Sequence, residues 1–283
     1  MRKGILPLVA ILALSASGEP VPNPVIEMFP REIRLYDSFD GGINPDVGLT
    51  TISGSFDHYH LSPDGFLGKC LDVGVLGFSQ TSAKPLIDTS KPGTILIWVK
   101  LLKEQKPISR GLATWEGGSS VFEAMGSNNH RMLIMKSVDT HWGDGQFWFF
   151  YEGDDEQGAH FSMHAATRCT FTDWKVGEWR LVAASWTAEK MFVSVNGKPY
   201  SSSPYDHKMQ VLKGNCYLKT ETWTSAGTQP GMFAIDECAI LSRKLSDEEV
   251  AQVYAKMVAK RRASRGFMLY LAENRMIECG DRR

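Results

Sequence analysis

A succession of short strand-like segments, each closed by a turn signal, runs from about residue 33 to residue 245 and constrains this chain more than any other feature. Residues 96–101 and 179–186 are apolar and of strand length, and residues 146–151 are almost entirely aromatic. Asn196-Gly197 is the strongest short hairpin signal available. Helical periodicity of useful length is missing from this region. The sequence therefore predicts an all-β fold, an antiparallel jelly-roll β-sandwich.

One amphipathic helix is predicted near the C-terminal end of the chain. Ser246 and Glu249 have the spacing of a capping box, which marks a helix start. Apolar residues then recur with helical spacing, so one helix face is expected to pack on the sandwich. This stripe consists of Val250, Val253, Tyr254, Met257 and Val258. Basic residues at 260–262 suit a last turn, and residues 259–283 are expected to form a basic tail.

The first residues are not expected to belong to the fold. Arg2 and Lys3 precede an apolar run that ends in small residues near Gly18, as in a cleaved secretion signal over residues 1–18. The run is about half as long as a membrane-spanning helix. We therefore expect an exported protein, periplasmic or extracellular, with no membrane span after cleavage. Residues 19–32 are rich in proline and predict an extended lead.

Charge and cysteine content narrow the possible partners. The net charge of −1 over 283 residues gives no argument for nucleic acid. The number of cysteines is odd, so at least one thiol is free or pairs outside the chain. Their spacing matches no zinc pattern, and both buried thiols and disulfides remain open. The five are Cys70, Cys169, Cys216, Cys238 and Cys279.

Seven ordered segments together carry a resemblance to a known family. They are LYDSFDG (35–41), GKCLDV (68–73), GTILIWVK (93–100), WRLVAASW (179–186), VSVNGK (193–198), IDECAI (235–240) and LSDEEV (245–250). In this order they resemble the landmarks of a laminin-G-like domain of the concanavalin A-like lectin/glucanase superfamily, over residues 33–258. The resemblance implies a fold and no single activity, because lectins, adhesion domains, glycanases and lyases share it.

Two adjacent carboxylates lie in the last predicted strand. Successive side chains on a strand face opposite sides of its sheet, so Asp236 and Glu237 are not expected to form a catalytic pair. We expect Asp236 to share a face with Cys238 and Ile240, and Glu237 to matter least.

A second acidic motif has the spacing that related glucanases use for catalysis. Glu152, Asp154 and Glu156 recur with a period of two, which places all three on one face of a strand. Gly153 and Asp155 stand where apolar strand residues belong, and they favour a polar loop tip. No catalytic residue is therefore predicted.

The resemblance also implies a structural calcium where the opening strand meets the closing one. Asp236 would be a side-chain ligand, with Asp37 or Asp40 approaching from the first strand. The alternative is that Asp236 accepts hydrogen bonds from a neighbouring loop and orders the sandwich. No complete calcium loop of EF-hand type is present.

Sugar binding requires flat aromatic faces beside hydrogen-bonding groups. Aromatic and polar residues in predicted turns are the candidates for such a site. They are Trp115, His141, Trp142, Asp144, Trp174 and Trp223. Tryptophans on predicted strands, at positions 98, 148, 179 and 186, are expected in the core.

Three functions are compatible with these patterns. The first is a secreted, non-catalytic glycan-binding domain, which would lose affinity when Trp142 or Trp115 becomes alanine. The second is a structural or adhesion domain that binds an envelope or extracellular protein. The third is a divergent glycoside hydrolase or polysaccharide lyase, whose product release would disappear in Glu152→Gln.

Overall fold

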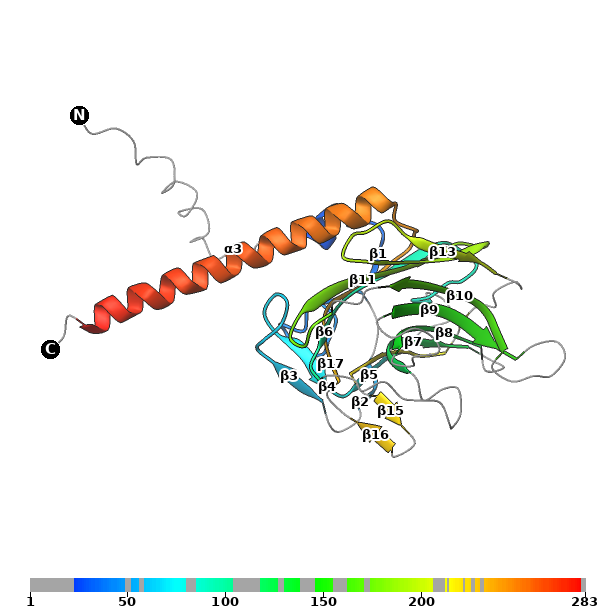
Figure 1. The fold of residues 1–283 in the computed structure, drawn as a ribbon, viewed down its shortest axis with the longest axis horizontal. Coiled ribbons are helices and arrows are strands. Elements are labelled where there is room, and N and C mark those ends of the chain that lie inside the picture. The colour runs from blue at the N-terminus through cyan, green and yellow to red at the C-terminus, as the bar shows by residue number, and fades with distance from the viewer. Residues whose placement is uncertain are drawn as a thin grey trace.

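The computed structural model describes residues 23–48, 52–55, 59–79, 85–103, 118–126, 130–137, 146–154, 162–170, 174–205, 212, 214–220, 222–224, 227–229 and 232–280. Two antiparallel sheets face each other, and the long helix α3 (Asp247–Gly280) lies outside one of them (Figure 1). The predicted antiparallel sandwich with one C-terminal helix is confirmed.

The first sheet contains eight of the described strands. Its spatial order is β13 (Ser201–Pro204), β12 (Lys190–Val195), β11 (Trp179–Trp186), β6 (Gly93–Leu101), β17 (Phe233–Leu241), β4 (Cys70–Val73) and β3 (His60–Ser62), and β1 (Ile33–Asp37) also pairs with β17. β17 is the last strand in the sequence and lies inside the sheet, between β6 on one side and β4 and β1 on the other.

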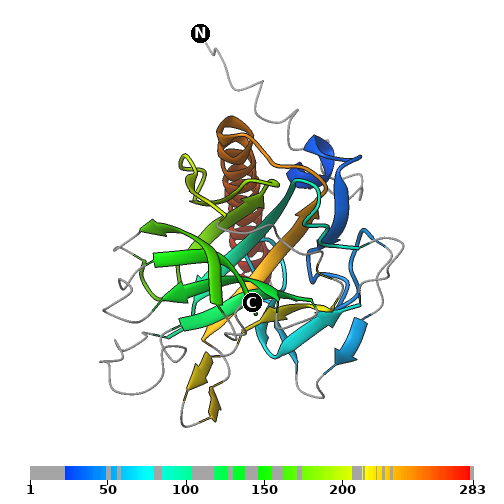
Figure 2. The ribbon, with the colours of Figure 1, turned by 90° about the vertical axis from the view of Figure 1, so that its right-hand side faces the viewer.

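The second sheet contains seven of the described strands. Its order is β10 (Ser162–Thr170), β9 (Gln146–Gly153), β8 (Arg131–Ser137), β7 (Gly118–Met125), β14 (Cys216–Lys219), β5 (Val75–Phe78) and β2 (Ile52–Ser55). A separate two-stranded ribbon joins β15 (Thr222–Thr224) to β16 (Gly227–Gln229). Figure 2 shows the two sheets from the side, with α3 behind them.

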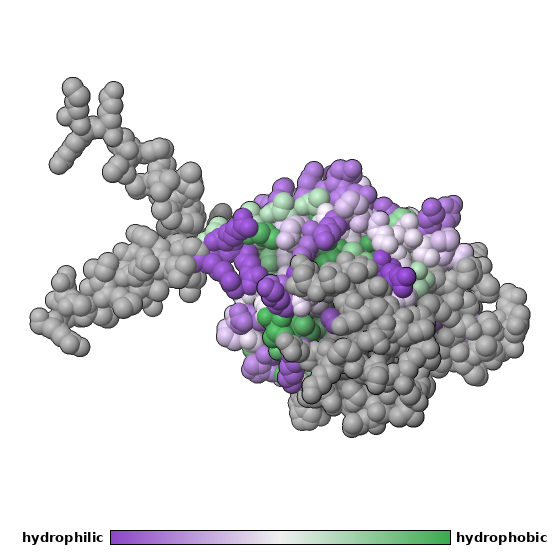
Figure 3. All heavy atoms as spheres, viewed as in Figure 1, coloured by the Kyte–Doolittle hydropathy of each residue, from purple (hydrophilic) through white to green (hydrophobic). Residues whose placement is uncertain are grey.

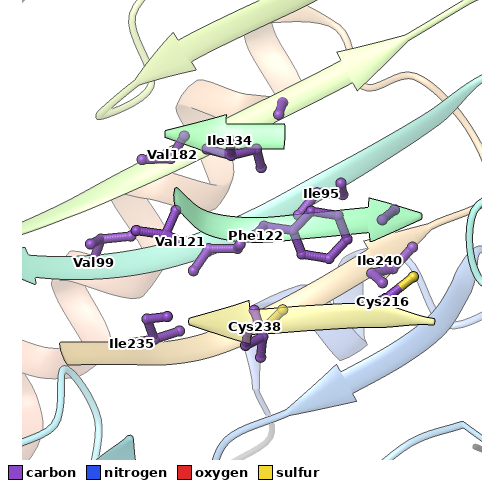
Figure 4. Packing of buried hydrophobic residues seen from close by; sticks show 14 of the residues in the cluster. Ile95, Val99, Val121, Phe122, Ile134, Val182, Cys216, Ile235, Cys238 and Ile240 are labelled. Carbon is purple, nitrogen blue, oxygen red and sulfur yellow. The ribbon is translucent and has the colours of Figure 1, made fainter. Parts of the chain in front are cut away.

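The main core lies between the two sheets. Residues of β6 alternate, so Ile95, Ile97 and Val99 face this core and meet residues such as Phe122 and Ile134 of the second sheet (Figure 4). All nine residues of β6 and all nine of β17 are buried. Both strands are buried on both of their faces because the outer face of the first sheet is covered as well.

A second apolar cluster covers that outer face. Leu96 and Trp98 of β6 contribute to it from the sheet, and Val250, Val253 and Met257 contribute from α3. The predicted apolar stripe of the helix is therefore the face that packs on the sandwich.

The predicted hairpin signal forms a turn between β12 and β13. Asn196 and Gly197 have φ angles of 55° and 71°, both in the left-handed region. The Lys198 N–H donates to the Val195 carbonyl across them. These angles match the twist of the flanking strands, which is why asparagine and glycine mark such turns.

Helix α3 begins as predicted and ends much later. The Ser246 N–H donates to Glu249, and the Glu249 N–H donates to the Ser246 hydroxyl, so the capping box is present. The helix then continues to Gly280, beyond the expected end near residue 262, and its C-terminal part leaves the sandwich (Figure 1). Residues after 262 are mostly good helix formers without proline, so the basic residues there do not end the helix.

Part of the proline-rich lead is helical, contrary to the expectation of an extended segment. α2 (Pro24–Met28) has Asn23 as its N-cap, and Pro24 suits the first helical turn. Val25 and Phe29 are buried in the outer-face cluster, which supplies the packing that the sequence pattern did not reveal.

Four cysteines are described with free thiols, and three of them are buried: Cys70, Cys216 and Cys238. Cys169 is partly exposed, and the side chain of Cys279 lies outside the described residues. Among the helices described, none is both long and apolar enough to span a bilayer.

Candidate functional site

The adjacent carboxylates of β17 lie on the same face of the sheet, contrary to the prediction. The step from Asp236 to Ala239 advances three positions along β17, whereas the paired step from Trp98 to Leu96 advances two along β6, so one extra residue forms a β-bulge. Glu237 is the bulged residue, with a φ of 52°. Asp236 pairs with Trp98 and points to the outer face, while Cys238 returns to the main core. The side chains do not alternate between the two faces here, because the bulged residue has no paired position on β6.

Glu237 is bound by the N-terminal part of the chain. The Asn23 amide donates to Glu237 Oε2 over 2.6 Å, and the Tyr36 hydroxyl donates to the same oxygen. Burial raises the pKa of the Glu237 carboxyl to about 7, although these hydrogen bonds act in the opposite direction. Glu237 therefore anchors the segment that leads into α2, and the expectation that it matters least is wrong.

Asp236 is bound by the loop before β4. Its Oδ2 accepts from the Leu67 N–H at 3.0 Å, and its Oδ1 accepts from the Glu237 N–H at 2.8 Å. Burial, and next the charge of Glu237, raise the pKa of Asp236. This arrangement agrees with the alternative in which Asp236 orders a neighbouring loop.

The three residues predicted as calcium ligands are not brought together. Asp236 faces the outer cluster, whereas Asp37 pairs with Cys238 and lies on the side of the main core, where burial raises its pKa to about 7. Asp40 is exposed and accepts from the Lys69 N–H at 2.7 Å. Within the described part of the chain, no three His, Cys, Asp or Glu residues could hold a metal ion. This geometry does not fit one metal site with these ligands, and calcium binding itself stays a prediction.

A cleft opens beside α3 on the outer face of the first sheet. It comprises two cavities of about 470 and 300 Å³ that share Trp179, Tyr254, Arg261 and Arg265. We call their union the α3 cleft. In Figure 3, hydrophilic residues gather where α3 meets the sandwich.

Aromatic rings form the wall of the α3 cleft. Phe66 stacks on Trp98 with ring centroids 3.5 Å apart, and Trp179 meets Phe66 edge-on at 6.2 Å. Tyr254 of α3 also stacks on Trp98, with ring centroids 5.8 Å apart. The wall therefore combines residues from a loop, two strands and the helix.

Charged side chains form the rim of the α3 cleft. Four arginines and two acids line the two cavities. Asp64 forms an ion pair with Lys100 at 2.7 Å, and Glu178 forms one with Arg180 at 2.9 Å. The arginines are Arg180, Arg261, Arg262 and Arg265. Because both acids have basic partners, the rim carries an excess of positive charge.

A second cluster of charges lies on the second sheet. Arg131 of β8 bridges Glu152 of β9 and Glu123 of β7, and Lys219 of β14 also pairs with Glu123. Burial raises the pKa of Glu152, and the charge of Arg131 lowers it.

The prediction of a loop tip is wrong for Glu152, which belongs to β9, while Asp154 follows that strand directly. Glu156 lies outside the described residues. Next to Glu152, the outward side chains of β8 and β9 form an apolar patch of Leu133, Trp148 and Phe150, and Arg168 stacks over Trp148.

Most of the predicted sugar-binding residues do not belong to the part of the chain that the structure describes. Trp115, His141, Trp142 and Asp144 lie outside the described residues, and Trp223 is described only as part of β15. Trp174 is partly buried, packs against Phe147 and Phe233, and donates from its indole to the Glu178 carbonyl at 2.8 Å.

The four strand tryptophans are buried as predicted, yet Trp98 and Trp179 also line the α3 cleft. Sequence reasoning missed this cleft because its residues come from distant segments. The arginines at 261, 262 and 265, beside the apolar stripe of the helix, were the available signal.

Comparison with known proteins identifies the family of this chain and solved structures of similar fold. A family model described as concanavalin A-like lectin/glucanases superfamily matches residues 77–251. No curated protein sequence matches the chain.

Several solved structures are similar in fold. One of them is described with the words "Cell entry of botulinum neurotoxin type C is dependent upon interaction with two ganglioside molecules". It has a TM-score of 0.61 and 12% sequence identity, and the match covers 82% of this chain and 53% of the solved chain. The botulinum neurotoxin serotype D ligand binding domain in complex with N-acetylneuraminic acid has a TM-score of 0.59 and 11% identity, covering 82% and 52%.

The binding domain of botulinum neurotoxin DC, in complex with rat synaptotagmin II, has a TM-score of 0.51 and 12% identity, covering 74% and 46%. The chain thus spans about half the length of these solved chains. At such low identity the likeness extends to the fold alone.

Proposed function

Because this chain belongs to the concanavalin A-like lectin/glucanase superfamily, we propose that it is a secreted, non-catalytic glycan-binding protein. The fold by itself does not select this activity. Structures of similar fold include binding domains whose descriptions name gangliosides and N-acetylneuraminic acid, and this supports a binding role.

The α3 cleft is the observation that carries the proposal. It is open to solvent, and it places the rings of Trp179 and Tyr254 beside polar groups of Asp64 and Asn196. Sugars present apolar C–H patches and hydroxyl rims, so they fit a site of this composition.

The charge cluster on the second sheet supports a non-catalytic role. A general acid must give up its proton to the substrate, and a nucleophilic carboxylate must reach the sugar. Glu152 and Glu123 are instead tied to Arg131 and Lys219 on a face where both are buried. This arrangement favours a structural function for the two acids.

The proposed location is outside the cytoplasm, in the periplasm or the extracellular space, because of the secretion signal predicted over residues 1–18. Partners there would be polysaccharides. A protein partner is the second candidate, supported by the description of the botulinum neurotoxin DC structure, which names synaptotagmin II.

Affinity electrophoresis of the purified protein through gels that contain different polysaccharides tests the proposal. We expect retardation in at least one glycan, and its loss in Tyr254→Ala. Tyr59→Ala is the matched control, because Tyr59 is an exposed tyrosine that does not line the cleft.

A chelator in a parallel gel tests the predicted calcium: loss of retardation would show that a metal is needed. Unretarded migration in every gel would contradict glycan binding and would turn attention to protein partners.

A further inference from the structure

We propose that the α3 cleft binds the acidic group of an anionic glycan, the carboxylate of a uronic acid or the sulfate ester of a sulfated sugar. This inference rests on the proposed glycan-binding function and names the chemical class of its ligand.

The balance of charge in the α3 cleft is the first argument. Lys100 balances Asp64, and Arg180 balances Glu178. Among the described residues, Arg261, Arg262 and Arg265 form no ion pair. Three guanidinium groups within little more than one helical turn repel one another, and an anion between them relieves that repulsion.

The position of Arg261 is the second argument. Its guanidinium carbon lies 4.6 Å from the centre of the Phe66 ring, so the group lies against the aromatic wall. Its Nε is buried and has no hydrogen-bond partner in the described part of the chain. A buried donor without a partner costs free energy, and a ligand oxygen could satisfy it.

The spacing along α3 is the third argument. Residues three or four apart lie on one helix face, so Tyr254, Val258, Arg261 and Arg265 form one row along the cleft. Arg261 and Arg265 are one turn apart and both line the two cavities. Planar guanidinium groups bind carboxylate and sulfate oxygens through paired N–H donors, which lysines do not reproduce.

The aromatic wall distinguishes an acidic sugar from a simple anion. Tyr254, which is partly exposed, and one edge of the buried Trp179 lie beside the arginines in both cavities, so a pyranose ring could pack on Tyr254 while its acidic group reaches Arg261. Asn196 lines the same cleft and offers a side-chain amide to hydroxyl groups. An acidic peptide would use the charges and leave the ring platform unused.

Matched pairs of polymers test the inference. Isothermal titration of the full chain would compare polygalacturonate with its carboxyl-reduced form, and dextran sulfate with dextran. We expect one acidic member to bind at least about tenfold more tightly than its neutral partner, a difference of about 1.4 kcal/mol. A difference within the polygalacturonate pair would indicate recognition of a carboxylate, and a difference within the dextran pair would indicate recognition of a sulfate ester. Polyglutamate serves as the control for charge alone.

Single substitutions on α3 locate the site. Arg261→Gln should weaken binding of the acidic polymer about tenfold and leave the neutral polymer unchanged. Lys256→Gln removes the same charge from an exposed position of α3 outside the cleft and should have no such effect. Arg265→Gln, at an exposed position, gives the same test if Arg261→Gln fails to fold.

The outcomes separate this inference from the broader proposal. Equal binding of each acidic polymer and its neutral partner would overturn the inference and leave glycan binding intact. Polyglutamate binding as tight as that of the acidic glycan, or equal losses in Arg261→Gln and Lys256→Gln, would also overturn it. Failure to bind any glycan would overturn both.

Discussion

Glu237 adopts a left-handed backbone conformation and is nearly inaccessible to solvent, a combination that costs free energy unless neighbouring groups compensate. Here the compensation comes from Asn23 and Tyr36, both more than 200 positions away in the sequence. The bulge therefore places two carboxylates on one face of the sheet. There Asp236 accepts a hydrogen bond from the loop at Leu67, and Glu237 accepts one from Asn23, the N-cap of α2.

Replacing Glu237 by glutamine should flatten the dependence of stability on pH. The pKa of Glu237 is about 7 in the folded protein and near 4.5 when unfolded, so the folded state keeps its proton longer. The stability that this carboxyl contributes is present below pH 4.5 and is lost as the pH rises to 7. Each unit of difference between the two pKa values corresponds to about 1.4 kcal/mol, so the loss of stability over this range is roughly 3 kcal/mol.

Urea unfolding at pH 4.5, 5.5 and 7 measures this effect. Glu237→Gln keeps an acceptor for Asn23 and Tyr36 but has no titrating group. As the pH rises from 4.5 to 7, the stability of this variant should therefore fall less than that of the parent protein. Glu189→Gln, at an exposed position, is the control and should follow the parent. Parallel profiles for the parent and Glu237→Gln would contradict the assignment of a raised pKa to this carboxyl.

At the scale of elements, α3 depends on its first turn. Ser246 and Glu249 satisfy each other's N–H groups, and Arg243 forms two hydrogen bonds to Glu249 at 2.7 Å. The cap fixes where the helix starts, and so it also fixes which residues face Trp98 and Phe66.

Ser246→Ala should lower the free energy of unfolding by about 1 kcal/mol, the usual cost of losing such a cap. Chemical denaturation measures the change. Ser264→Ala on the same helix is the matched control, because its hydroxyl bonds only to the Lys260 carbonyl on an exposed surface. A cost for Ser264→Ala as large as that for Ser246→Ala would show that the effect reflects helix propensity rather than the cap.

Local chemistry explains which elements could be predicted. Asn196-Gly197 and the Ser246–Glu249 pair act within a few residues, and both formed as expected. The bulge at Glu237 could not be predicted, because Asn23 and Tyr36, which stabilise it, are remote in sequence. α2 was missed for the same reason: its burial depends on a sheet face that sequence patterns do not place.

The candidate site was harder to predict than the fold. Trp179 of β11 was correctly expected to be buried, but one edge of a buried ring can still line a cleft. Trp179 and Arg261 line the same cleft only because α3 lies across the outer face of the first sheet. That placement follows from packing over the whole sheet, and the periodicity of the helix alone does not give it.

At the scale of the whole molecule, only the first part of α3 packs into the described core. Its buried residues are Val250, Val253 and Met257, and the helix beyond them leaves the sandwich (Figure 1). The fold should therefore tolerate loss of the C-terminal half of α3.

A chain that ends after Arg265 should unfold within about 0.5 kcal/mol of the full chain, as is usual for changes away from the core. Met257→Ala, which opens a cavity under the helix, should cost roughly 2–5 kcal/mol. Thermal and urea unfolding compare the three proteins. A large loss in the shortened chain would show that residues 266–283 contribute to the stability of the domain.

The place of β17 in the first sheet has a consequence for the order of folding. β6, β4 and β1 leave the ribosome long before the strand that they all contact, because β17 ends at Leu241. Until then the two parts of the sheet have no common neighbour, and the apolar faces of the sandwich cannot close. Contacts of such long sequence separation form late and slowly, so the sandwich in the nascent chain stays open until β17 has been synthesised.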